Sequence, residues 1–231
     1  MLDVFNWSNR IVFGAQHVTV KAAVDMSWDH LAEFSGGAVF GFVLDGENHM
    51  LRVNDRPYSL PSGSYFVVNA GTAQLSTPGG RILLVFAPGA DFPFQIGGPI
   101  EARGRMRYID GCTDSLIIPP WRRGEACLNL LHIPPGIEQT AHTHPSDRIG
   151  VVVEGAGQCV TLDAVTELRP GLIWRIPADG VHRFITRESH LKIVAWHPDS
   201  DTGPTDDDHP MVNRTMVGGI SAAEIDAIRT R

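Results

Sequence analysis

Short runs rich in Val, Ile, Leu and Phe recur along the whole chain of 231 residues, separated by turns. The 24 glycines and 16 prolines supply these turns, and the pattern is typical of an all-β sandwich or barrel. The first half contains five predicted strands, at Val18–Val24, Ala38–Leu44, Met50–Val53, Ser64–Val68 and Arg81–Phe86. The second half contains six, at Cys127–His132, Arg148–Glu154, Gln158–Leu162, Leu172–Ile176, His182–Thr186 and Leu191–Trp196.

Only the C-terminal end has a helical pattern. Ser221 and Glu224 form a capping box ahead of Ile225 and Ile228, which predicts a short helix there. A second helix remains an alternative for Ser27–Phe34. The sequence therefore predicts an all-β protein with a short C-terminal helix.

The two series of strands are related to each other. A turn, a strand pair, a second turn and a further strand occur in the same order in both halves, and Gly46 and Gly63 correspond to Gly155 and Gly171. This order predicts an internal duplication, with chance similarity between two all-β halves as the alternative. A boundary at Gly97–Pro99 then gives two domains, 1–98 and 99–200, followed by an acidic strap and helix at 201–231.

Composition excludes several classes of partner. The net charge of −7 and the absence of a basic stripe argue against nucleic acid. The first residues lack the basic start of a signal peptide, and no apolar run reaches the roughly 20 residues that cross a bilayer. The three cysteines, Cys112, Cys127 and Cys159, lack CxxC spacing and predict buried thiols. We therefore expect a cytoplasmic protein without membrane or nucleic-acid partners.

Three histidines form the main candidate site. His142 and His144 are two residues apart, just before the apolar run Ile149–Val153, and residues i and i+2 of a strand share a face. His182 follows a turn at 177–180, so it can enter the same space from a neighbouring strand. Three converging imidazoles predict a site for a first-row transition metal.

These histidines belong to a longer pattern. It reads Gly136-x5-His142-x-His144-x3-Arg148-x6-Gly155, followed by Gly171-x5-Pro177-x4-His182-x3-Thr186. This pattern resembles the two motifs of the cupin superfamily. The resemblance implies a double-stranded β-helix, or jelly-roll, barrel with a metal inside its mouth. Two tandem barrels would make the chain a bicupin, and a homodimer is expected by the same resemblance.

Arg148 departs from the family pattern, because many metal-binding cupins carry a glutamate ligand at this position. Arginine stays protonated and cannot ligate a metal. Three interpretations are open: Arg148 binds an anionic substrate group beside a three-histidine metal, it binds an anion in a site without metal, or it pairs with Asp147 or Glu154 as a structural salt bridge.

The first half lacks this set of ligands. The positions that correspond to the histidines and Arg148 are Glu33, Ser35, Val39 and Gln74. We therefore expect the first barrel to be degenerate, although its Glu and Gln offer weak ligands. Two further questions stay open in the second half. Either Asn129 or His132, which lie on opposite faces of one strand, lines the pocket, and His197 is either a surface residue or a group beside the site.

The predicted function is that of a metal-dependent enzyme acting on a small molecule. A three-histidine site implies, by resemblance, a dioxygenase with iron as the first choice of metal and Zn, Mn, Ni or Cu as alternatives. The alternatives in function are an isomerase or cyclase, and a binding protein without catalysis. We expect Arg148 to orient an oxygenated, anionic substrate, and Gln139, Trp174 and Phe184 to form the pocket walls.

Overall fold

A computed structural model describes residues 1–7, 10–13, 18–26, 36–200 and 210–228. The chain divides into two compact units, Met1–Ser200 and Asp201–Arg231, which we describe separately. Among the described residues, no helix has the length and apolar character needed to cross a membrane. The alternative helix at Ser27–Phe34 lies outside the described residues.

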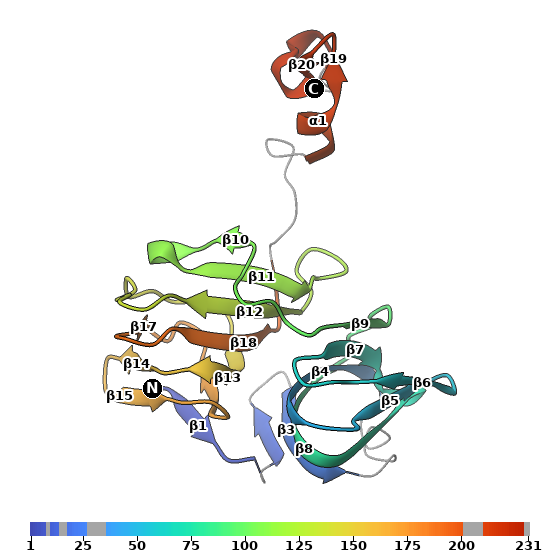
Figure 1. The fold of residues 1–231 in the computed structure, drawn as a ribbon, viewed down its shortest axis with the longest axis vertical. Helices are drawn as coiled ribbons and strands as arrows, with labels where there is room; N and C mark the ends of the chain where they lie inside the picture. Colours follow the sequence, from blue (N-terminus) through green and yellow to red (C-terminus); the bar gives the residue numbers. More distant parts are fainter. Residues whose placement is uncertain (8–9, 14–17, 27–35, 201–209, 229–231) are drawn as a thin grey trace. The chain divides into compact units, whose positions relative to one another are not determined.

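The first half of the larger unit contains one curled sheet with a hairpin beside it (Figure 1). The order in the sheet is β2-β3-β8-β4-β7-β9, and β5 joins β6 to β8. These elements are β2 (Arg10–Phe13), β3 (Val18–Met26), β4 (Gly37–Gly46), β5 (Met50–Val53), β6 (Arg56–Ser59), β7 (Tyr65–Asn69), the 3-10 turn η2 (Ala70–Thr72), β8 (Ala73–Pro88) and β9 (Gln95–Gly97).

The second half contains a seven-stranded sheet, β1-β16-β13-β18-β12-β11-β10, and a three-stranded sheet, β15-β14-β17. Its first strand comes from the N-terminus, because β1 pairs with β16. The elements are β1 (Asp3–Phe5), β10 (Met106–Arg107), the 3-10 turn η3 (Ile109–Gly111), β11 (Thr113–Ile118), β12 (Cys127–Ile133), β13 (Arg148–Gly155), β14 (Gly157–Thr161), β15 (Val165–Leu168), β16 (Ile173–Ile176), β17 (His182–Ile185) and β18 (Leu191–His197).

The two halves pair their strands in the same order. β3-β8-β4-β7 in the first half corresponds to β12-β18-β13-β16 in the second, and the hairpin β5-β6 corresponds to β14-β15. The difference is that the single long strand β8 of the first half is matched by two strands, β17 and β18. All eleven strands predicted from the sequence overlap an observed strand, which confirms the all-β prediction.

A shared irregularity supports this correspondence. The register between β4 and β8 shifts between Val43 and Asp45, and the register between β13 and β18 shifts between Val152 and Glu154. The glycine that follows Glu154 is Gly155, which has a φ of +81° and a main chain so close to its neighbour that a Cβ would lie 1.8 Å from a carbonyl oxygen. Only glycine tolerates both conditions, so this turn of the motif is fixed by sterics.

Apolar side chains fill both faces of the large sheets. One cluster lies inside the first half around Phe66 and Leu84, and another lies inside the second half around Trp174 and Ile193. A third cluster packs the outer faces of the two halves against each other. Its buried members are Ala38, Phe40, Phe42, Val67, Leu83, Val85, Ala87, Phe92, Ile118, Ala126, Leu128, Leu130, Ile149, Val151, Ile173, Val194 and Trp196.

The C-terminal unit is small and contains the short C-terminal helix that the sequence predicted, but this helix lies earlier in the chain than expected. Its α-helix α1 is Pro210–Arg214, and it is followed by β19 (Met216–Val217), β20 (Ile220–Ser221) and the 3-10 turns η5 (Ala222–Glu224) and η6 (Asp226–Ile228). The predicted position of the helix, from Ser221 onward, is therefore wrong, although the Ser221 hydroxyl does accept a bond from Ala223 N.

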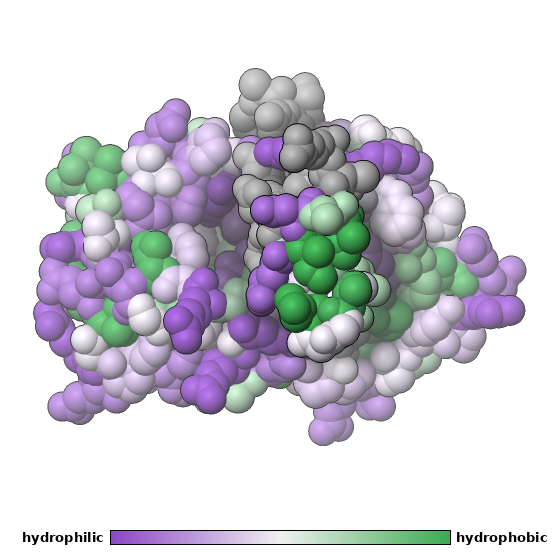
Figure 2. All heavy atoms as spheres, turned by 90° about the horizontal axis from the view of Figure 1, so that it is seen from above, coloured by the Kyte–Doolittle hydropathy of each residue, from purple (hydrophilic) through white to green (hydrophobic). Residues whose placement is uncertain are grey.

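A segment this short does not sustain an α-helix without an apolar face packed on a core, and Ile228 is 54% exposed. The unit also exposes Met211, Met216, Val217 and Ile220, and Figure 2 shows hydrophobic residues gathered in a patch among polar ones.

Candidate metal centre

The loop between β12 and β13 carries two of the three histidines and runs antiparallel to β17. Gln139 N donates to Phe184 O at 3.0 Å, and Thr186 N donates to Ile137 O at 2.8 Å. The Thr186 hydroxyl adds two bonds, accepting from Ile137 N at 3.1 Å and donating to the carbonyl of Pro134. These hydrogen bonds fix the position of the irregular loop beside β17, much as the main-chain bonds of a sheet fix a strand.

His142 and His182 face each other directly in this arrangement. His142 N donates to His182 O at 2.9 Å, and His182 N donates to His142 O at 3.0 Å. His144 follows, and its carbonyl accepts from Asp179 N at 2.8 Å. The expectation that His142 and His144 lie on a regular strand is wrong, because β13 begins only at Arg148 and His142 forms an isolated bridge.

The three imidazoles nevertheless converge. Each offers one nitrogen, and these three atoms lie within 4.8 Å of one another. Nδ1 of His142 lies 2.9 Å from the Thr140 carbonyl, and Nδ1 of His182 lies 2.8 Å from the Gly180 carbonyl. A carbonyl only accepts, so each Nδ1 carries the hydrogen, and Nε2 of the neutral ring presents its lone pair. The residues therefore fit a divalent transition metal.

The surroundings lower the pKa of two of these histidines, His144 and His182. Burial lowers the pKa of His144 to about 3, with the positive charge of Arg148 as the next cause. Burial also lowers the pKa of His182 to about 4, against the hydrogen bond to the Gly180 carbonyl, which raises it. Both rings are neutral at pH 7, and neutral imidazole is the form that ligates a metal.

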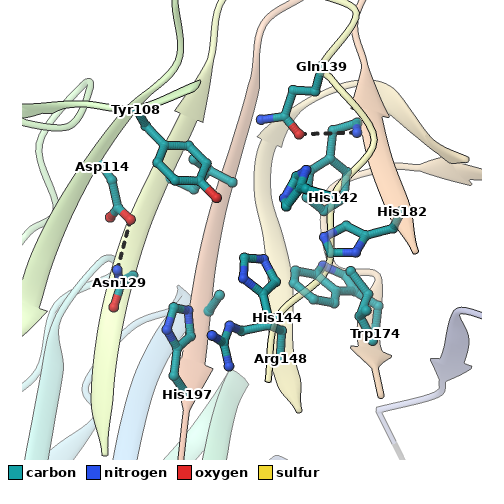
Figure 3. A pocket seen from close by; sticks show the side chains of 14 residues that line it. Tyr108, Asp114, Asn129, Gln139, His142, His144, Arg148, Trp174, His182 and His197 are labelled. Atoms are coloured by element: carbon teal, nitrogen blue, oxygen red, sulfur yellow. Dashed lines mark hydrogen bonds between the residues drawn. The ribbon is translucent and has the colours of Figure 1, made fainter. Parts of the chain in front are cut away.

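A small cavity of about 50 Å³ lies beside the histidines. The three residues expected as pocket walls, Gln139, Trp174 and Phe184, all line it, and Figure 3 labels the first two. The Gln139 amide is used within the protein, because Oε1 accepts from Phe184 N at 3.2 Å and Nε2 donates to Cys112 Sγ at 3.2 Å. Trp174 and Phe184 pack together with ring centroids 6.0 Å apart, so they form an apolar side of the cavity.

Arg148 also lines the cavity, and its side chain is only 11% exposed. Its Nη1 donates to the carbonyls of Ser146 at 3.1 Å and Asp147 at 3.2 Å and to the Ser146 hydroxyl, and it lies 3.7 Å from Asp199 Oδ1. Its Nε is buried without a hydrogen-bond partner.

The structural salt bridges that the sequence suggested for Arg148 are not formed. The carboxylate of Asp147 bonds to Arg175 Nε at 2.8 Å, and Glu154 bonds to Lys192 Nζ at 2.8 Å. Arg148 instead approaches Asp199, at the end of the larger unit. A side chain anchored through one nitrogen, with another unbonded beside a cavity, is suited to bind an anion.

Sequence reasoning did not assign four further lining residues, which lie across the cavity from Trp174 in Figure 3: Tyr108, Asp114, Asn129 and His197. Asn129, not His132, lines the pocket, which resolves the alternative left by strand parity. For His197, the signal was its spacing from Ile193 and Ala195, which face the barrel interior. For Asp114, the signal was a carboxylate within the apolar strand β11.

Burial also shifts the pKa values of three of these four residues, Tyr108, Asp114 and His197. Burial raises the pKa of Tyr108, and the charge of Asp114 raises it further. Burial likewise raises the pKa of Asp114, against the hydrogen bond from Asn129, and lowers that of His197 well below its usual value. At pH 7 the wall therefore offers a neutral phenol and a neutral imidazole beside a carboxylate with few partners.

The first half has no comparable site among the residues that the structure describes. Glu33 and Ser35 lie outside those residues. Val39 is fully buried in the apolar interior, and Gln74 accepts a bond from Arg52 Nη1 at 3.1 Å. Neither described position offers a metal ligand.

Comparisons with known proteins agree with this geometry. Residues 129–197 match the family described as "Cupin domain". A sequence search of curated proteins found no match. Among solved structures, a variant of salicylate 1,2-dioxygenase from Pseudoaminobacter salicylatoxidans, in complex with gentisate, is similar with a TM-score of 0.58 and 10% identity. The match covers 78% of this chain and 68% of that chain.

A second solved structure is similar over more of the chain. It is a protein from Pseudomonas aeruginosa described as glyoxylate-induced, with a TM-score of 0.66 and 13% identity over 88% of this chain and 82% of that chain. At these identities the likeness concerns the fold. The matched segment 129–197 contains all three histidines and Arg148, so the part of the chain that matches a cupin domain is the part that carries the candidate site.

Proposed function

We propose that the chain is a metal-dependent enzyme acting on a small molecule, with His142, His144 and His182 holding one divalent transition metal. The observation that carries this proposal is the convergence of three imidazoles, whose ligand atoms lie within 4.8 Å of one another, beside a cavity. A metal held by three neutral ligands keeps its full positive charge and supplies Lewis acidity or, if it is iron, oxygen chemistry. Iron is our first choice, with zinc, manganese, nickel or copper as alternatives.

The reaction that we propose is a dioxygenation of an oxygenated, anionic substrate. Arg148 binds the anionic group, because its side chain lines the cavity that the histidines share and its Nε has no hydrogen-bond partner. A cation beside the metal is tolerated when an anion lies between them. The similar fold of salicylate 1,2-dioxygenase supports this choice of reaction, although a fold alone hosts many reactions.

The size of the cavity limits the substrate. A cavity of about 50 Å³ accepts a small carboxylate rather than a large ring system without rearrangement of the walls. Trp174 and Phe184 would pack on the carbon skeleton, and their burial excludes water from that side.

A second candidate, metal-dependent isomerisation or cyclisation, is favoured by one specific observation. Tyr108 and His197 line the same cavity, and both are uncharged groups of the kind that exchange protons with a substrate. A binding protein without catalysis is the remaining alternative.

Oxygen uptake tests the reaction. Protein reconstituted anaerobically with iron(II) would be mixed with small hydroxylated carboxylates, and oxygen consumption followed with an electrode. We expect uptake that requires substrate, falls at least a hundredfold in His182→Gln, and shows a raised KM in Arg148→Gln. Substrate conversion without oxygen uptake in the zinc-loaded protein would instead establish the isomerase. If no substrate is converted with any of these metals, the proposal that the chain is an enzyme is contradicted.

Three further properties belong to this proposal. The shared pairing order of the two halves supports a bicupin with a degenerate first barrel. The three cysteines are buried and unpaired, which supports a reducing cytoplasm. We also propose a homodimer, which sedimentation equilibrium tests directly: a mass of about twice the chain's 25.2 kDa is expected, and a mass equal to it would contradict the dimer.

A further inference from the structure

Buried polar atoms without partners gather at one place in this molecule. Among the described residues, six buried side-chain nitrogen or oxygen atoms have no hydrogen-bond partner, and three of them belong to residues that line the histidine cavity. These three are Asp114 Oδ1, Arg148 Nε and Trp174 Nε1. Such atoms are rare in folded proteins because each costs free energy, and a cluster at a cavity points to a ligand that completes their bonds.

The three atoms divide by chemistry and by position. Arg148 and Trp174 are donors on the neighbouring strands β13 and β16, which pair Arg148 with Ile176 and Gly150 with Trp174. Asp114 is an acceptor on β11, with Asn129 beside it on β12. Figure 3 shows Asp114 and Asn129 on the opposite side of the cavity from Trp174. One end of the cavity therefore lacks an acceptor, and the other lacks a donor.

Small residues keep the space between these two ends open. In the sheet order, β18 lies between β13 and β12, and its residue between Asn129 and Gly150 is Ala195. Ala195 lines the cavity, and Gly150 has no side chain, so the indole of Trp174 lies directly over it. A larger side chain at either position would separate the two ends.

Asp114 is poorly compensated as a structural carboxylate. Its Oδ2 accepts from Asn129 Nδ2 at 2.8 Å, while Oδ1 has no partner, and no cation forms an ion pair with it among the described residues. The Asn129 amide is itself oriented, because its Oδ1 accepts from the Cys127 thiol at 3.2 Å. The Asp114 side chain is half-buried, but its Oδ1 is enclosed without a partner, which is unfavourable unless a further donor arrives.

We propose that Asp114, positioned by Asn129, is a specificity-determining residue that selects a substrate with a hydroxyl or amino group at the end opposite its anionic group. This inference rests on the proposed function for the anionic end at Arg148, and it narrows the substrate class. The ligand is a small hydroxycarboxylate or aminocarboxylate, with its acceptor end at Arg148 and Trp174 and its donor end at Asp114.

Matched ligands test the inference in the unmodified protein. Isothermal titration calorimetry would compare acetate with glycolate and glycine, propionate with 3-hydroxypropionate and β-alanine, and butyrate with 4-hydroxybutyrate and 4-aminobutyrate. For at least one chain length, we expect a substituted ligand to bind at least tenfold tighter than the unsubstituted one. Equal affinities at every length, or no binding by any of the nine ligands, would overturn the inference.

The variant Asp114→Asn assigns the preference to this residue. It keeps the bond from Asn129 and replaces the unpaired acceptor by a donor, so we expect the tenfold advantage of the substituted ligand over the unsubstituted one to fall to less than twofold. Asp163→Asn, at an exposed position in the turn between β14 and β15, is the matched control and should retain the advantage. An advantage that persists in Asp114→Asn would overturn the inference.

Metal content, measured on the same samples before and after chelation, separates the two claims. If a protein that binds no metal still prefers the substituted ligands, the proposed metal-dependent activity is contradicted and the role of Asp114 is supported. If the metal-loaded protein shows no preference for the substituted ligands, the role of Asp114 is contradicted and the proposed metal-dependent activity is not.

Discussion

At the scale of the residue, His144 and His182 of the candidate site are kept neutral by their surroundings. His182 is 1% exposed, and its Nδ1 hydrogen bonds to a carbonyl two residues away. Arg148 adds a positive charge near the rings of His144 and His182. The same residues that prepare a metal site therefore make the metal-free protein sensitive to acid.

The metal-free protein should lose stability as the pH falls from about 6.5 to about 4. In this range the unfolded chain binds a proton at His182, whose ordinary pKa is 6.5, while the folded protein with a pKa of about 4 does not. Unfolding is therefore favoured, and the loss at pH 5 relative to pH 7 is roughly 2 kcal/mol from this residue. Urea unfolding at the two pH values measures it. His182→Gln should remove that part of the dependence, and an unchanged dependence would contradict the account.

Single residues also mark how far the sequence predicted the site. The spacing of His142, His144 and His182 was sufficient to predict their convergence, because the motif contains both sides of one strand pair. The partner of Arg148 was not predictable, since Asp199 is 51 residues away in the chain and meets it only through the fold. Tyr108 lies in an irregular segment before η3, where no periodicity indicates the direction of a side chain.

At the scale of the element, the pairing between the histidine loop and β17 determines the geometry of the site. The loop has no regular secondary structure of its own, and its order comes from main-chain bonds to β17 and from the Thr186 hydroxyl. This explains why Thr186, which does not line the cavity, belongs to the sequence motif that contains His182.

Thr186→Val tests this role. The substitution keeps the shape of the side chain but leaves Ile137 N and the Pro134 carbonyl without their bonds, so we expect a loss of about 1–3 kcal/mol in unfolding free energy. Metal affinity should fall as well, because the loop loses its anchors five and eight residues before His142. Thr166→Val, on strand β15, is the control. Full stability and full metal binding in Thr186→Val would show that the loop does not depend on this hydroxyl.

The elements themselves were predictable to different degrees. Long strands such as β4 and β13 are continuous apolar runs because both of their faces are buried, and such runs are plain in the sequence. The short strands β6, β15 and β19 carry mostly polar or exposed residues, so their pairing is set by neighbouring strands rather than by their own pattern. At the C-terminus, the Ser221 hydroxyl accepts the hydrogen bond from Ala223 N that a capping box predicts, but the residues that follow form 3-10 turns and no α-helix.

At the scale of the whole molecule, the two halves of the larger unit share one core. Phe40 of the first half and Trp196 of the second are both 1% exposed, and their rings lie 6.1 Å apart in an edge-to-face contact. Trp196 is adjacent to His197, which lines the histidine cavity. The first half therefore supports the outer face of the sheet whose inner face carries the site.

Phe40→Ala should destabilise both halves together. Removing a fully buried ring leaves a cavity in the shared core and costs about 3–5 kcal/mol. In differential scanning calorimetry of the full chain, residues 1–200 should unfold in one transition, and the variant should shift this whole transition to lower temperature. Two separate transitions, with only the first displaced, would show that the halves fold independently.

The central claim is that three histidines hold a metal, and elemental analysis tests it most directly. The protein would be purified without chelator or affinity metal, beside His142→Ala and His182→Gln, with thermal unfolding to confirm that each variant is folded. The account predicts about one equivalent of a transition metal in the parent and less than a tenth of that in both variants. A parent that remains without metal after reconstitution, or variants that retain it while folded, would contradict the account.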